Sequence, residues 1–231
     1  RNSLLWVYEG QTQYWGNVLA ARSGLYSKDQ AIEYLAFIAS RYTNMPGRSW
    51  RYLEDTTNDP IISNRAPQSW RSYQLSEDYY SEGLLIWFDA DTLIREKTDN
   101  KKSLDDFAKV FFGIKDGDWG TITYKFDDIV TTLNVVYSYD WTTFFKTRLY
   151  GLSPSALLDG FTRGGYKLVY TDMPTNFHKA LEADSNYDDF TYSIGATLDK
   201  EGVFKNILWD GPLFKAGLAP GVQLVAVNGK T

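Results

Sequence analysis

The chain has 231 residues and a formal net charge of −5, a length that fits one large or two modest domains. Hydrophobic residues make up 43% of it and aromatic residues 16%, which supplies a sizeable core and argues against disorder. The acidic balance argues against nucleic acid as a partner, and the absence of cysteine excludes disulfides, cysteine zinc sites and thiol nucleophiles.

Two helical segments are predicted at the start of the chain. Residues 3–23 carry apolar groups at helical spacing, and residues 28–42 follow Ser27, a favourable N-cap. Residues 45–70 are rich in Pro, Asn, Arg and Asp, which is typical of an irregular loop region. Further helices are predicted after Ser76 and Ser103, because each serine precedes an acidic pair.

The predicted helices continue over residues 127–163, with breaks at Gly151 and Pro154. After Gly165 the pattern changes to strands at residues 166–172, 192–199, 203–209 and 223–229. We therefore expect a mainly α fold with two parts, a helical part over residues 1–165 and a small β-rich part over residues 166–231. No uncharged run is apolar enough for a membrane span. The chain begins in a helix pattern without a signal-like segment, so we expect a piece of a longer protein.

Glu9 is the only charged residue between Arg1 and Arg22, and aromatic residues flank it at Trp6, Tyr8, Tyr14 and Trp15. One interpretation is a buried carboxylate paired with an arginine or a backbone donor. The other is a metal ligand, because a divalent cation offsets the cost of burying a carboxylate. Thr12 and Gln13 fall on the same helix face, where they could hydrogen-bond the ligand and orient it.

The stretch "LLWVYEGQTQYWG" resembles the third-ligand segment of thermolysin-like zinc peptidases (gluzincins), and it is most similar to the glycyl aminopeptidase family. The resemblance implies that Glu9 binds zinc, that Gly10 allows close helix packing and that Thr12 supports the ligand. It also implies two histidines and a general-base glutamate from an H-E-x-x-H helix. That motif is not in this chain, whose only histidine is His178, and we expect the motif before Arg1. For His178 we expect a short exposed helix and no metal.

A second stretch, "YYSEGLLIWFDADTLIREKTDNKKSLDDF", resembles the family's Tyr-Tyr-x-Lys-Gly helix. The resemblance implies that Tyr80, three residues before Gly83, donates its hydroxyl to the oxyanion formed during catalysis. Glu82 stands where the family has lysine, and Tyr79 is the neighbour that is out of register. The alternative is a packed tyrosine with its hydroxyl at the surface.

The tail, from "YSIGATLD" to "VQLVAVNGKT", resembles a bacterial PDZ domain that stops before its second helix. The resemblance implies that Ser193, Ile194, Gly195 and Ala196 form a loop for the terminal carboxylate of a peptide. The peptide would add as a strand beside "ATLD". A structural or docking role is the alternative for this part.

Four arginines, Arg48, Arg51, Arg65 and Arg71, cluster in the irregular region. We expect solvated charges. The alternative is that one of the four pairs with a carboxylate of the substrate or with one that supports the site, and the sequence does not single out which.

Together these features predict the C-terminal part of a zinc aminopeptidase that removes N-terminal residues, glycine among them, from peptides. By itself the chain should be inactive, since one carboxylate cannot hold catalytic zinc. The alternative is a non-catalytic peptide-binding or docking module that uses the PDZ-like part. The resemblance points to the bacterial periplasm, and a cytoplasmic location stays open.

Overall fold

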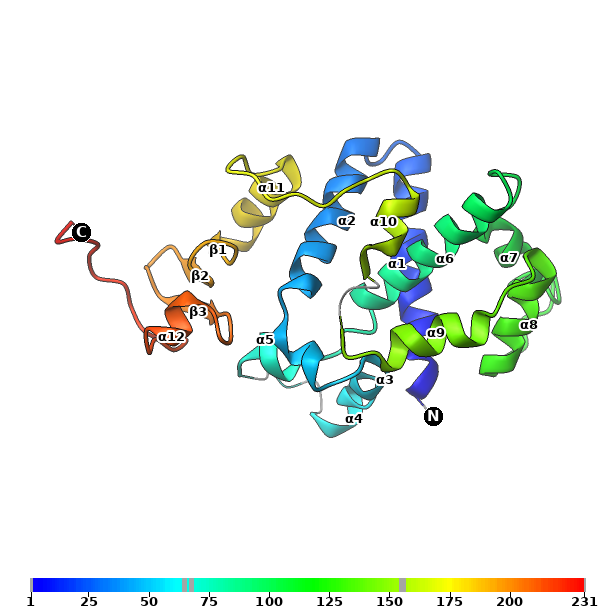
Figure 1. The fold of residues 1–231 in the computed structure, drawn as a ribbon, viewed down its shortest axis with the longest axis horizontal. Helices are drawn as coiled ribbons and strands as arrows, with labels where there is room; N and C mark the ends of the chain where they lie inside the picture. The colour runs from blue at the N-terminus through cyan, green and yellow to red at the C-terminus, as the bar shows by residue number, and fades with distance from the viewer. Residues whose placement is uncertain (1, 64–65, 67–68, 154–156, 231) are drawn as a thin grey trace.

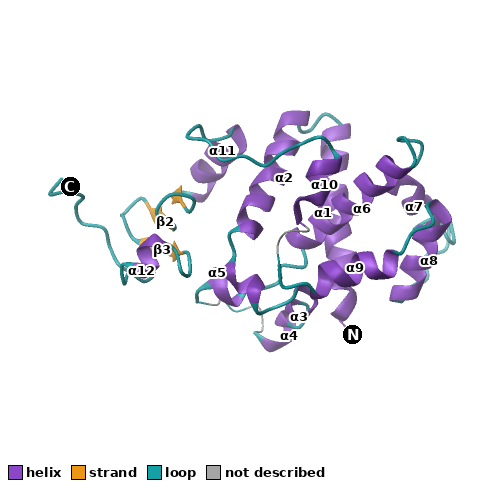
Figure 2. Cartoon of the chain, viewed as in Figure 1, coloured by secondary structure: helices purple, strands orange, loops and turns teal. Residues whose placement is uncertain are grey.

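The computed structural model describes residues 2–63, 66, 69–153 and 157–230. It is mainly helical, with a three-stranded sheet near the C-terminus (Figure 2), which confirms the expected fold class. In this described part, no helix combines the length and the apolar character needed to cross a membrane. The helices of the first part are η1 (Asn2–Leu4), α1 (Leu5–Arg22), α2 (Lys28–Thr43), η2 (Pro46–Ser49), α3 (Leu53–Thr56), α4 (Asp59–Ile62), α5 (Arg71–Gln74), α6 (Ser81–Lys97), α7 (Leu104–Phe111), α8 (Phe126–Val136), α9 (Trp141–Tyr150) and α10 (Asp159–Arg163).

The centre of the helical body is the contact between α1 and α6, which lie side by side in Figure 1. A Cβ atom built on Gly10 would lie 2.8 Å from the carbonyl carbon of Gly83, so the two backbones touch. Trp6 of α1 stacks on Trp87 of α6 with ring centroids 5.8 Å apart, and the Trp87 indole N–H donates to the Trp6 carbonyl at 3.2 Å. Both indoles are buried. The close packing expected of Gly10 is confirmed.

The helix starts follow local capping where a serine can bond the first turn. Ser27 and Ser103 each form a capping box, with Gln30 and Asp106 as the reciprocal partners. Ser76 does not cap α6, which begins only at Ser81. The reason is that Glu77 has a positive φ of 50°, a conformation that a right-handed helix cannot include.

Before α6, the buried carboxylate of Asp78 holds the turn. It accepts the backbone N–H of Ser76 at 2.9 Å and the hydroxyl of Tyr42 at 2.8 Å. The start of α6 is therefore set by a contact with α2, which a local sequence pattern does not contain. Farther along the chain, Gly151 follows the end of α9, as expected, and the predicted break at Pro154 lies outside the described residues.

Buried arginines organise the irregular segment, contrary to the expectation of solvated charges. Arg48 is 3% exposed, and its Nη2 lies 2.8 Å from Glu82 of α6. Arg51 donates to Asp59 at 2.6 Å and to Asp55 at 2.7 Å. The two guanidinium groups thus join this segment internally and to α6, because a buried arginine needs a carboxylate partner to offset its loss of hydration.

The two other arginines of the predicted cluster behave differently. Arg71 is exposed at the first position of α5. Arg65 lies outside the described residues.

The C-terminal part contains less strand than predicted. Its elements are α11 (Asn176–Ser185), β1 (Tyr187–Phe190), β2 (Ala196–Asp199), β3 (Phe204–Ile207) and α12 (Pro212–Lys215). The sheet is antiparallel in the order β1-β2-β3, so β2 is its central strand. The helix expected around His178 is confirmed as α11.

The expectation that residues 166–231 are mainly strand is wrong at two segments. Residues 166–172 run without a ladder partner, because Leu168 packs on the helical core and the Tyr170 hydroxyl bonds Asn44 of α2. Residues 223–229 form only isolated bridges in the described structure, Gln223 with Val203 and Val227 with Lys230, and no strand. The apolar alternation is present in both segments, but a strand also needs a neighbour to pair with.

The sheet sits beside the helical body, near α2 and α5 (Figure 1). The backbone N–H of Trp209 donates to the hydroxyl of Ser72 at 2.9 Å. The Tyr192 hydroxyl lies 2.7 Å from the Ser40 hydroxyl. Trp70 packs edge-on against both Trp209 and Phe214. The predicted division near residue 165 stays a prediction. Two buried apolar clusters, one in the helical body and one around β2 and β3, are compatible with it.

Candidate functional site

The side chains of Glu9 and Tyr80 meet on one surface, although 71 residues separate them. The Tyr80 hydroxyl donates to Glu9 Oε1 at 3.0 Å. Glu9 lies in the second turn of α1, and Tyr80 directly precedes α6. If the two groups serve one zinc centre, their side chains must lie within about 10 Å of each other. This limit combines the distance from a ligand oxygen to zinc with the distance from the hydroxyl donor to the reacting oxygen. The structure confirms this convergence.

The two tyrosines before α6 differ in their surroundings: one lies in the core and the other contacts Glu9. Tyr79 is 1% exposed and belongs to the hydrophobic core, while Tyr80 is half-buried. Their rings stack with centroids 4.9 Å apart. The hydroxyl that contacts Glu9 is therefore that of Tyr80, the tyrosine predicted from its position three residues before Gly83.

The backbone contact between Gly10 and Gly83 fixes this geometry. Each glycine lies within three residues of a site side chain, so the helix crossing sets the distance between Glu9 and Tyr80. A methyl group at either glycine would meet backbone atoms at 2.8–2.9 Å. The small residues thus act on the site through the spacing of the helices.

Thr12 and Gln13 lie one turn beyond Glu9. The Thr12 hydroxyl donates to the Tyr8 carbonyl of its own helix at 2.8 Å. Support of Glu9 by Thr12 and Gln13 stays a prediction.

The same helix face leads into a cavity of about 530 Å³ between α1, α2 and α11. Thr12, Gln13 and Asn17 line it on the α1 side. Asn17 is 6% exposed, and its Oδ1 has no hydrogen-bond partner in the described part of the chain. The sequence reasoning missed Asn17, although its position eight residues after Glu9 places it on the Glu9 face.

Residues 1–86 match the family model of the M61 glycyl aminopeptidases. The matched segment contains Glu9, Tyr80 and both contact glycines, so the predicted resemblance is confirmed over this range. A search of curated proteins gives no match.

The residues that the structure describes do not form a zinc site by themselves. Among the described residues, no group of three or more His, Cys, Asp or Glu side chains could hold a metal ion. A carboxylate oxygen is a suitable zinc ligand, but an M61 centre needs more ligands than Glu9. His178 is remote from α1 in sequence, and its Nε2 lies 3.6 Å from Glu182 on α11.

Within the M61 segment, Glu82 occupies the position at which the family resemblance expects lysine. Its side chain is 1% exposed and pairs with Arg48. Burial raises the pKa of Glu82 to about 7, and the positive charge of Arg48 opposes the rise. The glutamate at this position thus has a buried arginine beside it, and the positive charge of Arg48 balances the charge of the carboxylate.

The predicted carboxylate loop lies outside the M61 match and is closed in the structure. The backbone N–H groups of Ser193, Ile194 and Gly195 all point to the Phe190 carbonyl, at 3.1, 3.1 and 3.0 Å. Ala196 already belongs to β2. A peptide carboxylate would have to displace the Phe190 carbonyl from these donors.

The strand expected to accept a peptide is also paired on both sides. β2 bonds β1 along one edge and β3 along the other. Addition of a peptide beside Ala196–Asp199 therefore requires displacement of β1 or β3. Peptide binding at this loop stays a prediction.

Proposed function

We propose that the chain is the C-terminal part of a zinc-dependent aminopeptidase that removes N-terminal residues, glycine among them, from peptides. The observation that carries the proposal is the hydrogen bond between Tyr80 and Glu9 inside the segment that matches the M61 family. Two residues far apart in sequence, each singled out by the resemblance, meet there.

Glu9 would contribute one carboxylate ligand. When bound, zinc supplies polarisation of the scissile carbonyl and activation of water. The two remaining ligands and the general base would come from residues outside this sequence. The half-buried position of Glu9 suits this task, because its carboxylate stays accessible from one side.

Tyr80 would donate its O–H to the oxygen that becomes negative during attack on the carbonyl. In the present structure the phenol donates to Glu9, which holds its ring at the site. On substrate binding the phenol would exchange this acceptor for the substrate oxygen, since catalytic hydrogen bonds commonly form only in the complex. A donor of this kind lowers the barrier by about 3 kcal/mol, or 10²–10³ in kcat.

The test compares the 231-residue chain with a longer protein that carries an upstream H-E-x-x-H helix, using glycyl p-nitroanilide and zinc analysis. We expect turnover only from the longer protein. Within it, Tyr80→Phe should lower kcat by about 10²–10³ at unchanged zinc content, and Glu9→Gln should lower zinc content. Tyr139→Phe, which removes an exposed phenol just before α9, is the matched control. Zinc-dependent turnover by the 231-residue chain, or full kcat in Tyr80→Phe, would contradict the proposal.

A second candidate is a non-catalytic peptide-binding module. It would use the C-terminal sheet for binding, with the helical body as its scaffold. The upstream coding sequence separates the two candidates, because an intact H-E-x-x-H supports the peptidase and its substitution supports the binding module.

A further inference from the structure

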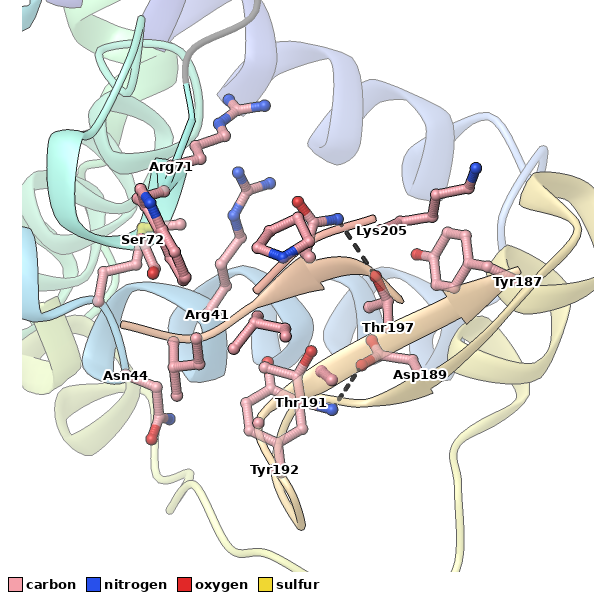
Figure 3. Close-up of a pocket in the computed structure, with 18 of the residues that line it drawn as sticks. Arg41, Asn44, Arg71, Ser72, Tyr187, Asp189, Thr191, Tyr192, Thr197 and Lys205 are labelled. Atoms are coloured by element: carbon pink, nitrogen blue, oxygen red, sulfur yellow. Dashed lines mark hydrogen bonds between the residues drawn. The ribbon is translucent and has the colours of Figure 1, made fainter. Parts of the chain in front are cut away.

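A second cavity, of about 660 Å³, lies where the C-terminal sheet meets the helical body (Figure 3). Its walls come from the second half of α2, from α5 with the residues just before it, from β1, β2 and β3, and from the loops beside these strands. It shares no lining residue with the cavity next to Glu9. Its volume is in the range of small-ligand sites.

Two arginines from different elements face this cavity. Arg41 lies in the last turn of α2 and Arg71 at the start of α5, and Figure 3 shows both guanidinium groups turned toward the same space. Neither has an ion pair with a carboxylate in the described part of the chain. Arg71 donates to the Ser76 carbonyl over 3.4 Å, and the guanidinium carbon of Arg41 lies 5.9 Å from the Tyr42 ring.

The other charged groups of the wall do not neutralise this pair. Lys205 lies 2.8 Å from Asp199, so its charge is already matched. Asp189 accepts the N–H of Thr191 at 2.8 Å and forms no ion pair with a described residue, so its single negative charge leaves the two arginines in excess. The cavity therefore holds an excess of positive charge, and two cations that face one space repel each other unless an anion lies between them.

Neutral donors complete the wall. Ser72 accepts the N–H of Trp209, so its own hydroxyl proton can be donated into the cavity. Arg guanidinium groups bind carboxylate and phosphate oxygens through paired hydrogen bonds. An oxyanion is thus the ligand class that fits both the charge and the donors.

We propose that this cavity binds a ligand with a carboxylate or phosphate group, held jointly by Arg41 and Arg71. The site is independent of the peptidase chemistry. Gly195 and Ala196 of the predicted carboxylate loop line the cavity, but the proposed contacts with the oxyanion come from the two arginines. Because its walls come from both parts of the chain, an occupied site ties the C-terminal sheet to α2 and α5.

The test is calorimetric titration of the 231-residue chain at constant ionic strength with two probes. Inorganic phosphate presents one oxyanion, and acetyl-Gly-Glu-Gly-amide presents a side-chain carboxylate without a terminal one. We expect a Kd below about 1 mM for at least one probe. Arg41→Gln and Arg71→Gln should each weaken binding about ten-fold or more, while Lys101→Gln, which removes an exposed charge outside the cavity, should not.

Far-ultraviolet circular dichroism checks that each variant is folded. Binding of phosphate alone or of the peptide alone supports the site and identifies the oxyanion. The proposal is overturned if neither probe binds, or if either arginine variant binds as tightly as the wild type. Neither hydrolysis nor zinc enters the measurement, so its outcome is separate from that of the proposed function.

Discussion

At the scale of single residues, the two adjacent tyrosines before α6 are the most informative. Their rings stack, yet Tyr79 is sealed in the core and Tyr80 reaches Glu9. Tyr80 is the last residue before the helix, and the turn there directs consecutive side chains to different surroundings. One position of register therefore separates a packing residue from a residue that contacts Glu9.

Gln11 carries the clearest prediction at this scale. It is 4% exposed, and neither amide atom has a hydrogen-bond partner in the described structure. Because a buried polar group without a partner costs about 1–3 kcal/mol, Gln11→Leu should raise the free energy of unfolding by about 1 kcal/mol. Urea denaturation measures the change.

The matched control is Gln30→Leu. Gln30 accepts the Ser27 N–H at 2.8 Å, so the same substitution removes a capping bond and should cost about 0.5–1 kcal/mol. A loss of stability in Gln11→Leu would show that its amide is satisfied in solution.

At the scale of elements, we expect the contact between α1 and α6 to tolerate little added side-chain volume. In Gly10→Ala the new methyl group would meet the Gly83 backbone at 2.8 Å. Overpacking of this kind costs about 1–3 kcal/mol, and the displaced helices should separate Glu9 from Tyr80. Thermal and urea unfolding of the chain measure the first effect, and kcat of the longer peptidase measures the second.

Gly16 of the same helix provides the comparison. A Cβ atom there has no neighbour within 4 Å, so Gly16→Ala should be neutral or stabilise by up to about 1 kcal/mol through helix propensity. Equal effects at Gly10 and Gly16 would mean that the backbone contact does not matter.

The same scale shows what the sequence can and cannot predict. Caps at Ser27 and Ser103 were predictable because a capping box is local. The start of α6 was not, since Asp78 bonds Tyr42 from a distant helix. The prediction of a strand at 166–172 is wrong for the same reason, because Leu168 and Tyr170 contact the helical body instead of a strand. Glu9 and Tyr80 were predictable only through their family motif, and the pairing of Arg48 with Glu82 had no sequence signal.

At the scale of the whole molecule, Glu82 links stability to pH. Its pKa of about 7 in the folded state lies above the ordinary 4.5, so the folded protein binds more protons than the unfolded one between these values. Stability should therefore fall as pH rises from about 5 to 7, by up to about 3 kcal/mol. Urea unfolding across this range measures the slope.

Glu82→Gln cannot titrate, so its stability should change much less over the same range. Glu96→Gln, at an exposed carboxylate of α6, should keep the wild-type slope. If the wild type and Glu82→Gln show the same pH dependence, burial of Glu82 is not its cause.

The glycine contact between α1 and α6 also has a consequence for motion. Two backbones in direct contact, fastened by stacked indoles, leave the helices no free path along which to slide. We therefore expect Glu9 and Tyr80 to move together in any opening or closing of the molecule. The C-terminal sheet contacts the helical body through side chains around a cavity. We therefore expect a hinge motion at this junction and not at the helix crossing.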